Sequence, residues 1–162
     1  MRPLLIAAAL ALAPLAGLTT APQAFAEAKP TQKGGVTVSQ LREIVGDLGY
    51  TVQDADSSQR PSFEFKITKA GLDIFVLTQE SDDAGLIWLK LSFDKLKPGQ
   101  DASLFLQQTA DIYPASFFLY DEGTLGMIVS IENRGITPEI VQSRIDILIE
   151  AAISSQQHWL TD

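Results

Sequence analysis

Along this chain the spacing of apolar residues alternates between the period of a helix and the period of a strand. The order of these segments is the sequence feature that most limits which fold the chain can adopt. Near the start, four apolar residues recur with the spacing that places side chains on one face of a helix: Leu41, Ile44, Val45 and Leu48. From Phe63 to Thr68, apolar and charged or polar residues alternate, as in a strand with one buried face. Such a mixture predicts helices packed on a sheet.

The same reading extends to the whole chain and predicts eight main segments. In chain order they are a helix over 38–48, strands over 63–68, 72–79 and 86–93, a helix over 102–112, strands over 117–120 and 126–132, and a helix over 138–153. A further short strand is expected near 50–52. The fold class is therefore α+β, a twisted antiparallel sheet of about five strands flanked by three helices in the order α-β-β-β-α-β-β-α.

Capping residues mark the start of each expected helix. Thr37 and Gln40 have the spacing of a capping box. Asp101 is expected to accept hydrogen bonds from the first amides of the second helix. The run from Thr137 to Glu139 places a cap, a proline and an acid at the start of the third. The tail from Ser154 onward is expected to fray.

Several of these segments resemble the YbjN family. The resemblance rests on Leu41 to Tyr50, on Leu86-Ile87-Trp88-Leu89, on the hairpin sequence FFLYDEGTLGM and on the helix sequence GITPEIVQSRIDIL. It spans about Val36 to Ile153. The family is described as regulators of sensory transduction without a settled activity. The resemblance implies a fold similar to that of type III secretion chaperones, in which helices flank a twisted antiparallel sheet.

The first 26 residues have the pattern of a secretory signal peptide. Arg2 precedes an apolar run from Leu4 to Leu18, and Ala24-Phe25-Ala26 fits the small-x-small rule for cleavage after Ala26. An uncleaved membrane anchor is the alternative, but the run is shorter than the roughly 20 residues a spanning helix needs. We expect a signal peptide over 1–26, a flexible N-terminus over 27–36, a single domain over 37–162, and a periplasmic or secreted protein.

Charge and cysteine content exclude several classes of function. The formal net charge of −8 disfavours binding to nucleic acids, whose phosphates are negative. The chain has no cysteine, which excludes disulfides, thiolate nucleophiles and cysteine-bound metals. We expect no cofactor, no metal and no stable membrane insertion after cleavage.

Catalytic patterns are lacking in the sequence. The only histidine is His158, in the tail that is expected to fray. The run from Asp54 to Ser58 imitates an EF-hand loop, but Gln59 and Phe65 occupy the positions that need glycine and a bidentate acid. Two pairs of adjacent acids lie in expected turns, where they usually face water: Asp82-Asp83 and Asp121-Glu122. We expect no catalytic residue.

The parity of the strands points to a candidate contact surface. If Phe65 and Ile67 face the helices, the opposite face of the sheet carries four large apolar residues: Phe75, Leu77, Leu86 and Trp88. A sheet face in water should be more polar. Either a helix covers this face or it contacts a partner, and a bulge could reverse the parity.

These observations favour an exported, non-enzymatic binding or chaperone-like module. Its expected partners are a second copy of the chain, giving a homodimer, or a protein, a peptide or a small apolar ligand. The alternatives are an enzyme that uses only carboxylates, which would need two acids converging in a pocket, and a structural component of the cell envelope.

Overall fold

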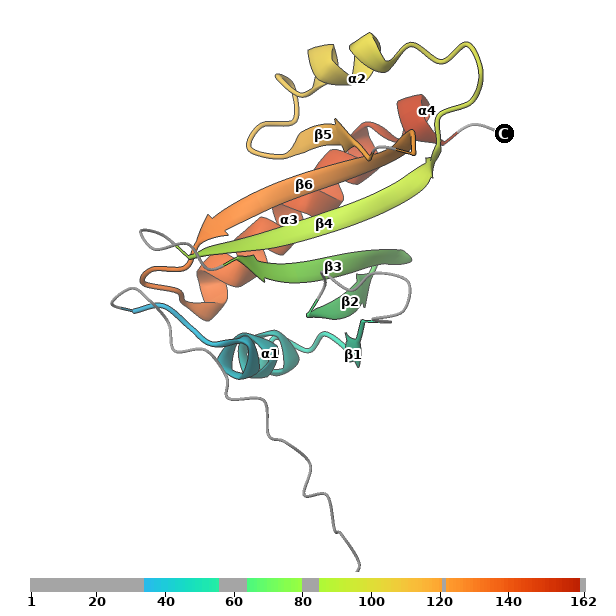
Figure 1. Ribbon diagram of the computed structural model, residues 1–162. Coiled ribbons are helices and arrows are strands. Elements are labelled where there is room, and N and C mark those ends of the chain that lie inside the picture. The colour runs from blue at the N-terminus through green and yellow to red at the C-terminus, as the bar shows by residue number, and fades with distance from the viewer. Residues whose placement is uncertain (1–33, 56–63, 80–84, 121, 161–162) are drawn as a thin grey trace, which may run out of the picture.

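The computed structural model describes residues 34–55, 64–79, 85–120 and 122–160. Its elements, shown in Figure 1, are α1 (Val38–Asp47), β1 (Val52–Asp54), β2 (Phe65–Lys69), β3 (Leu72–Gln79), β4 (Leu86–Lys95), α2 (Ala102–Gln108), β5 (Ser116–Leu119), β6 (Thr124–Glu132), α3 (Pro138–Ser154) and α4 (Gln156–Trp159). The α+β class is confirmed. The described chain has one more strand than the five expected in the sheet and one more helix than the three expected.

The strands form one antiparallel sheet in the order β1-β2-β3-β4-β6-β5. β3 and β4 are its two central strands, and β4 pairs with β6 from Leu86 opposite Glu132 to Lys95 opposite Thr124, with a register shift between Ser92 and Lys95. The short strand expected near 50–52 is β1, a three-residue edge strand that begins at Val52 and pairs with β2.

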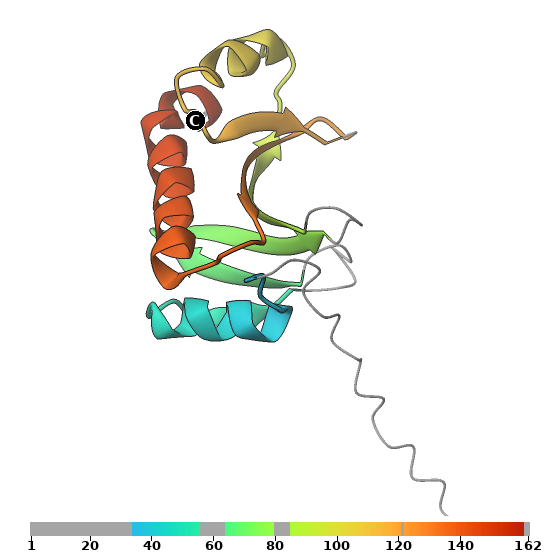
Figure 2. The same cartoon turned by 90° about the vertical axis from the view of Figure 1, so that its left-hand side faces the viewer.

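The helices pack against one face of the sheet. The side chains buried on that face follow the expected parity in β2, β3 and β4: Phe65, Ile67, Ile74, Val76, Ile87, Leu89 and Leu91. Figure 2 shows α3 running along this face, with α1 beside it. α3 contributes a buried stripe that includes Ile145 and Leu148, and α1 contributes Leu41 and Val45. The assignment of strand faces from sequence is therefore confirmed.

The capping interactions are formed as predicted. The Thr37 hydroxyl accepts from the Gln40 amide at 3.3 Å, and the Gln40 side chain accepts from the Thr37 amide at 2.9 Å. Asp101 accepts from the Ser103 amide at 2.8 Å. Each cap satisfies an amide that has no partner within its own helix.

The second helix is shorter than expected. α2 ends at Gln108 instead of Ile112, and the chain then forms turns in which Asp111 and Ile112 donate to the Gln108 carbonyl. The Thr109 hydroxyl donates to the Phe105 carbonyl and accepts from the Phe117 amide, which directs the chain into β5. Such contacts between distant residues leave no mark in local periodicity.

Two predictions about apolar stripes are wrong. The apolar spacing in the sequence predicts Leu104 on the apolar side of the second helix and Ile153 in the apolar stripe of the third, but these residues are 50% and 53% exposed. In the short α2, Phe105 is the residue that reaches the core. In α3 the stripe closes with Ala151 and Ala152, which are buried.

The C-terminal segment is packed, contrary to the expected fraying. Ser155 is buried, and α4 brings the Trp159 ring onto Phe93 with a centroid separation of 4.3 Å. The indole nitrogen donates to the Ala152 carbonyl at 2.9 Å. An aromatic ring of this size gains enough from burial to hold a short helix in place.

The first described residues are also tied to the fold. Val36 donates to the Asn133 side chain at 2.7 Å and accepts from it at 2.9 Å, and Ile136 donates to the Gly34 carbonyl at 3.1 Å. The expected flexible N-terminus is therefore held at its last three residues. Residues 27–33 and the expected signal peptide lie outside the described residues. None of the described helices is both long and apolar enough to cross a bilayer.

Candidate functional site

The face of the sheet opposite the helices carries the four residues predicted as a contact surface. We call Phe75, Leu77, Leu86 and Trp88 the open sheet face; all four are half-buried. Leu77 lies directly opposite Trp88 on neighbouring strands, and Trp88 lies opposite Ser130 on the next strand. Phe75 and Leu86 lie two residues away from this row, on the same face. The fold thus brings the four predicted residues together.

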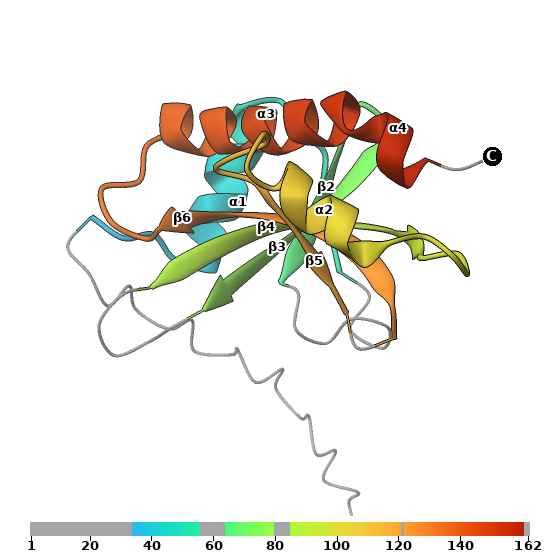
Figure 3. The same ribbon diagram turned by 90° about the horizontal axis from the view of Figure 1, so that it is seen from above.

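The described helices do not supply a cover for this face. Figures 2 and 3 place α3 and α1 on the other side of the sheet. α2 packs on the same side as α3, where the Phe105 ring contacts the Phe117 ring edge-on with a centroid separation of 5.2 Å. α4 packs there too, because its Trp159 ring stacks on Phe93. Of the two alternatives left by the sequence, cover by one of these helices is therefore wrong.

Charged and polar residues surround the open sheet face. Lys66 forms an ion pair with Asp73 at 2.9 Å beside Phe75. The Lys90 ammonium lies 5.7 Å above the Phe118 ring, and burial lowers the pKa of Lys90 from its ordinary value. At the other end Glu132 lies opposite Leu86. The arrangement is an apolar centre with a polar rim, which is the anatomy of a protein interface.

Aromatic residues missed in the sequence extend this face onto β5. The Phe118 ring lies over Gly126, where an added Cβ would approach the ring to 2.5 Å. Tyr120 meets Phe118 edge-on at 4.8 Å, and its hydroxyl is buried without a hydrogen-bond partner among the described residues. The pairing of Phe118 with Gly126 could have indicated this extension of the face, but the pairing is known only once the strand register is known.

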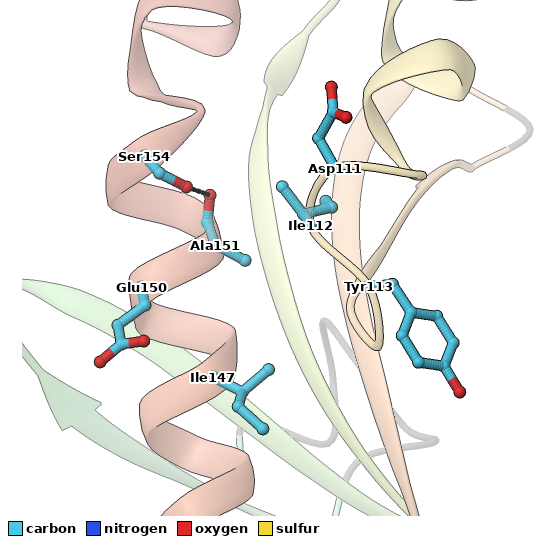
Figure 4. A pocket seen from close by; sticks show the side chains of 7 residues that line it. All are labelled: Asp111, Ile112, Tyr113, Ile147, Glu150, Ala151 and Ser154. Atoms are coloured by element: carbon cyan, nitrogen blue, oxygen red, sulfur yellow. Dashed lines mark hydrogen bonds between the residues drawn. The ribbon is translucent and has the colours of Figure 1, made fainter.

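Among the described residues, the two carboxylates that line the groove beside α3 do not converge as the pair in an acid-only enzyme does (Figure 4). A groove of about 300 Å³ lies between α3 and the connection from α2 to β5 (Figure 4). Asp111 and Glu150 both line it, but Figure 4 shows their side chains pointing in different directions. Paired-acid catalysis needs two carboxylates facing one substrate bond. Ile112, Ile147 and Ala151, which also line this groove, have no catalytic side chain.

The acids singled out in turns form surface ion pairs where they are described. Asp54 pairs with Arg42 at 2.7 Å, and Glu122 lies 3.4 Å from Lys95. Asp56, the pair at 82–83 and Asp121 lie outside the described residues. Within the described ranges, no group of three or more acids and histidines could hold a metal ion.

His158 lies in α4 and faces an amide. Its Nε2 is 3.0 Å from the Gln157 side-chain nitrogen, and the ring is half-buried. A catalytic imidazole is normally oriented by a carboxylate or a carbonyl on one nitrogen and acts through the other. The described surroundings of His158, up to residue 160, do not provide that arrangement.

The comparisons with known proteins add little to this geometry. No family model matches the chain, and no curated protein matches it in sequence. A chain in the crystal structure of the ExsC-ExsE complex superposes with a TM-score of 0.48 at 12% identity, covering 75% of this chain and 94% of that chain. A likeness at that level does not transfer a function. The resemblance to the YbjN family stays a prediction.

Proposed function

We propose that this protein is a non-enzymatic binding module that holds another protein on its open sheet face. The observation that carries the proposal is the position of Trp88, beside Leu77 and Leu86 on a central strand and on the side of the sheet away from the four described helices (Figure 2). Tryptophan is enriched among the few residues that supply most of the binding energy of a protein interface. Such residues lie near the centre of the interface and are surrounded by a polar rim.

A protein fits this face better than other ligand classes. The net charge of −8 disfavours nucleic acid and anionic lipid. A small apolar ligand would require an enclosing pocket, since such sites bury most of the ligand surface. Neither Trp88 nor Phe75 lines the α3 groove of Figure 4 or the small cavity beside α2. A strand surface of mixed aromatic and aliphatic side chains suits the broad, shallow contact that proteins make.

The proposal includes export and a chaperone-like role. The signal pattern over 1–26 supports action outside the cytoplasm, where a cysteine-free chain is indifferent to oxidation. A stable sheet that retains a partner segment on its half-buried apolar face would keep that segment from aggregating. A homodimer formed through the same face makes a different prediction in the test below.

The test combines site-specific cross-linking with affinity measurement. A photo-reactive side chain at position 88 should trap a partner in the exporting cell, whereas the same side chain at Ile153, on the exposed side of α3, should not. With the purified partner, Trp88→Ala should weaken binding by about 2 kcal/mol, roughly 30-fold in dissociation constant. Ile153→Ala is the matched control and should bind as the wild type does.

The stability of the same variant separates an interface from a core residue. Since Trp88 is half-buried, Trp88→Ala should leave the chain folded and should cost well below the 3–5 kcal/mol typical of a fully buried aromatic residue. A loss of that size with unchanged affinity would contradict the proposal. If cross-links at position 88 join only two copies of this chain, the face is a homodimer interface and the proposed foreign partner is wrong.

A further inference from the structure

Lys90 places a positive charge between the open sheet face and its aromatic extension onto β5, on the side of the sheet away from the helices (Figure 2). It lies on the central strand β4, in a cross-strand row that runs from Lys66 through Phe75 and Lys90 to Ile128. Trp88 lies two residues away on the same strand and on the same face. Lysine normally covers apolar surface with its stem and extends its charge into water, so a half-buried lysine in this position needs an explanation.

The Lys90 ammonium is packed against hydrocarbon and is partly removed from water. Its nitrogen lies 5.7 Å from the centre of the Phe118 ring, and half-buried Phe75 and Ile128 flank Lys90 on the two neighbouring strands. Burial lowers the pKa of Lys90 from its ordinary value of 10.5, because the charged form loses water there. A negative charge that covered the ammonium would offset part of this loss, in surroundings where water screens an ion pair less than on an open surface.

We infer that the open sheet face recognises a partner segment that carries an acidic side chain between apolar ones, and that Lys90 receives this carboxylate. This inference rests on the proposed function and adds the chemistry of the partner. The apolar side chains of the segment would pack on Phe75 and Trp88, and the carboxylate would lie over Lys90 beside them. An extended segment suits this arrangement, because its side chains on one face recur at every second residue, as Trp88 and Lys90 do on β4.

The distribution of charge makes Lys90 a determinant of specificity. Asp73 and Glu132, which border the face, are held in ion pairs with Lys66 and Arg134, each at 2.9 Å. The net charge of −8 repels acidic segments in general, but salt screens charges beyond roughly 8 Å, so the local cation decides which charge is accepted at this place. A segment with a neutral residue there would cover the ammonium without a counter-charge, and one with a basic residue would bring like charges together.

Selection from a library of random peptides displayed on phage tests the inference before the partner is known. The purified wild-type chain should enrich peptides in which aspartate or glutamate stands between large apolar residues. Lys90→Met should remove this preference, and Lys90→Glu should reverse it toward lysine and arginine. An equal content of acidic residues in the peptides enriched by the wild type and by Lys90→Met would overturn the inference.

The same selection with Trp88→Ala separates this inference from the proposed function. If Trp88→Ala loses the peptides that the wild type enriches, and those peptides show no preference for acids, the open sheet face binds as proposed and only the role of Lys90 is wrong. If the wild type enriches no peptide, or Trp88→Ala enriches the same ones, the proposed function fails and this inference fails with it.

Affinity measurement with an enriched acidic peptide gives the size of the effect. Lys90→Met should raise the dissociation constant about tenfold, whereas Lys90→Arg, which keeps the charge, should raise it less than about threefold. Lys66→Met is the matched control, because Lys66 lies in the same cross-strand row and already pairs with Asp73; its dissociation constant should stay within about twofold of the wild type. Thermal melting checks that each variant is folded.

A double-mutant cycle then locates the carboxylate of the peptide. Replacing the acid of the peptide by its amide should weaken binding to the wild type about tenfold and should have little effect on binding to Lys90→Met. An equal loss with both chains would mean that the carboxylate binds elsewhere on the surface, and would overturn the inference.

Discussion

At the scale of single residues, Trp159 is the clearest case of a side chain whose role depends on tertiary contact. Stacking on Phe93 and the hydrogen bond to Ala152 fix a four-residue helix that would not form alone. Nothing in the local sequence distinguishes this tryptophan from one in a mobile tail.

Trp159→Ala should therefore destabilise the protein. Because the ring is half-buried, the expected loss in the free energy of unfolding is about 2 kcal/mol, below the cost for a fully buried aromatic residue. Chemical denaturation followed by circular dichroism measures it. Leu160→Ala, at the neighbouring exposed position, is the control and should change stability by no more than about 0.5 kcal/mol. Equal effects of the two variants would mean that α4 does not hold the ring in place.

Lys69 supplies a prediction about pH. Its ammonium donates to Asp146 on α3 and to the Tyr50 hydroxyl at 3.0 Å, and the Asp146 hydrogen bond raises the pKa of Lys69 above its ordinary value of 10.5. The unfolded chain therefore releases this proton at lower pH than the folded chain does. The stabilisation from the contact is fully present below the ordinary pKa and is lost as pH rises through the raised one.

Lys69→Met should lower the free energy of unfolding near neutral pH by about 0.5 kcal/mol, since both partners are partly exposed and water screens the pair. The difference from the wild type should shrink as pH rises through the raised pKa. Urea denaturation at a series of pH values measures both. Lys95→Met is the control, because Lys95 lies in a longer and more exposed pair. A difference between Lys69→Met and the wild type that persists at the highest pH would show that packing, not charge, is responsible.

At the scale of elements, the sequence predicts those with strong periodicity and clear boundary residues. β3 has the expected limits, and α1 and α3 begin at the residues set by their caps and end within one residue of prediction. Prediction fails where a contact distant in sequence sets the boundary: the Thr109 hydroxyl at the end of α2 and Phe93 under α4. The open sheet face could be predicted because strand parity is a local property. The apolar cavity of about 150 Å³ between α2 and β5 could not be predicted, since it depends on how α2 lies against β5.

The connection from β6 to α3 provides a prediction at this scale. Asn133 exchanges two hydrogen bonds with Val36 and so holds residues from the start of the domain against the connection. Asn133→Ala should destabilise the fold by about 1–2 kcal/mol, because two half-buried backbone groups lose their partner. Hydrogen exchange at the Val36 amide should accelerate more than exchange in α3. Arg134→Ala, at the adjacent exposed position, should leave both unchanged. If hydrogen exchange at the Val36 amide is the same in both variants, the two Asn133 hydrogen bonds do not hold this segment in place.

At the scale of the whole molecule, the helices α1 and α3 lie on one side of the sheet and the open sheet face lies on the other (Figures 2 and 3). The open sheet face is built on β3 and β4, the two central strands of the order β1-β2-β3-β4-β6-β5. These strands are paired on both sides, so a partner bound there would contact a part of the sheet that is held by neighbouring strands and would leave the core beneath the helices undisturbed.

Export is the last property to test, and it rests on the Ala24-Phe25-Ala26 motif. Expression of the full chain in a bacterium should yield mature protein that begins at Glu27, as determined by N-terminal sequencing of the periplasmic or secreted fraction. Because signal peptidase accepts only small side chains at the first and third positions of the motif, Ala26→Phe should block cleavage. Phe25→Leu changes the unrestricted middle position and should be processed normally. A chain that keeps Met1 in the membrane fraction would instead indicate an uncleaved anchor. An intact chain in the cytosol would contradict export and place any partner of Trp88 in the cytoplasm.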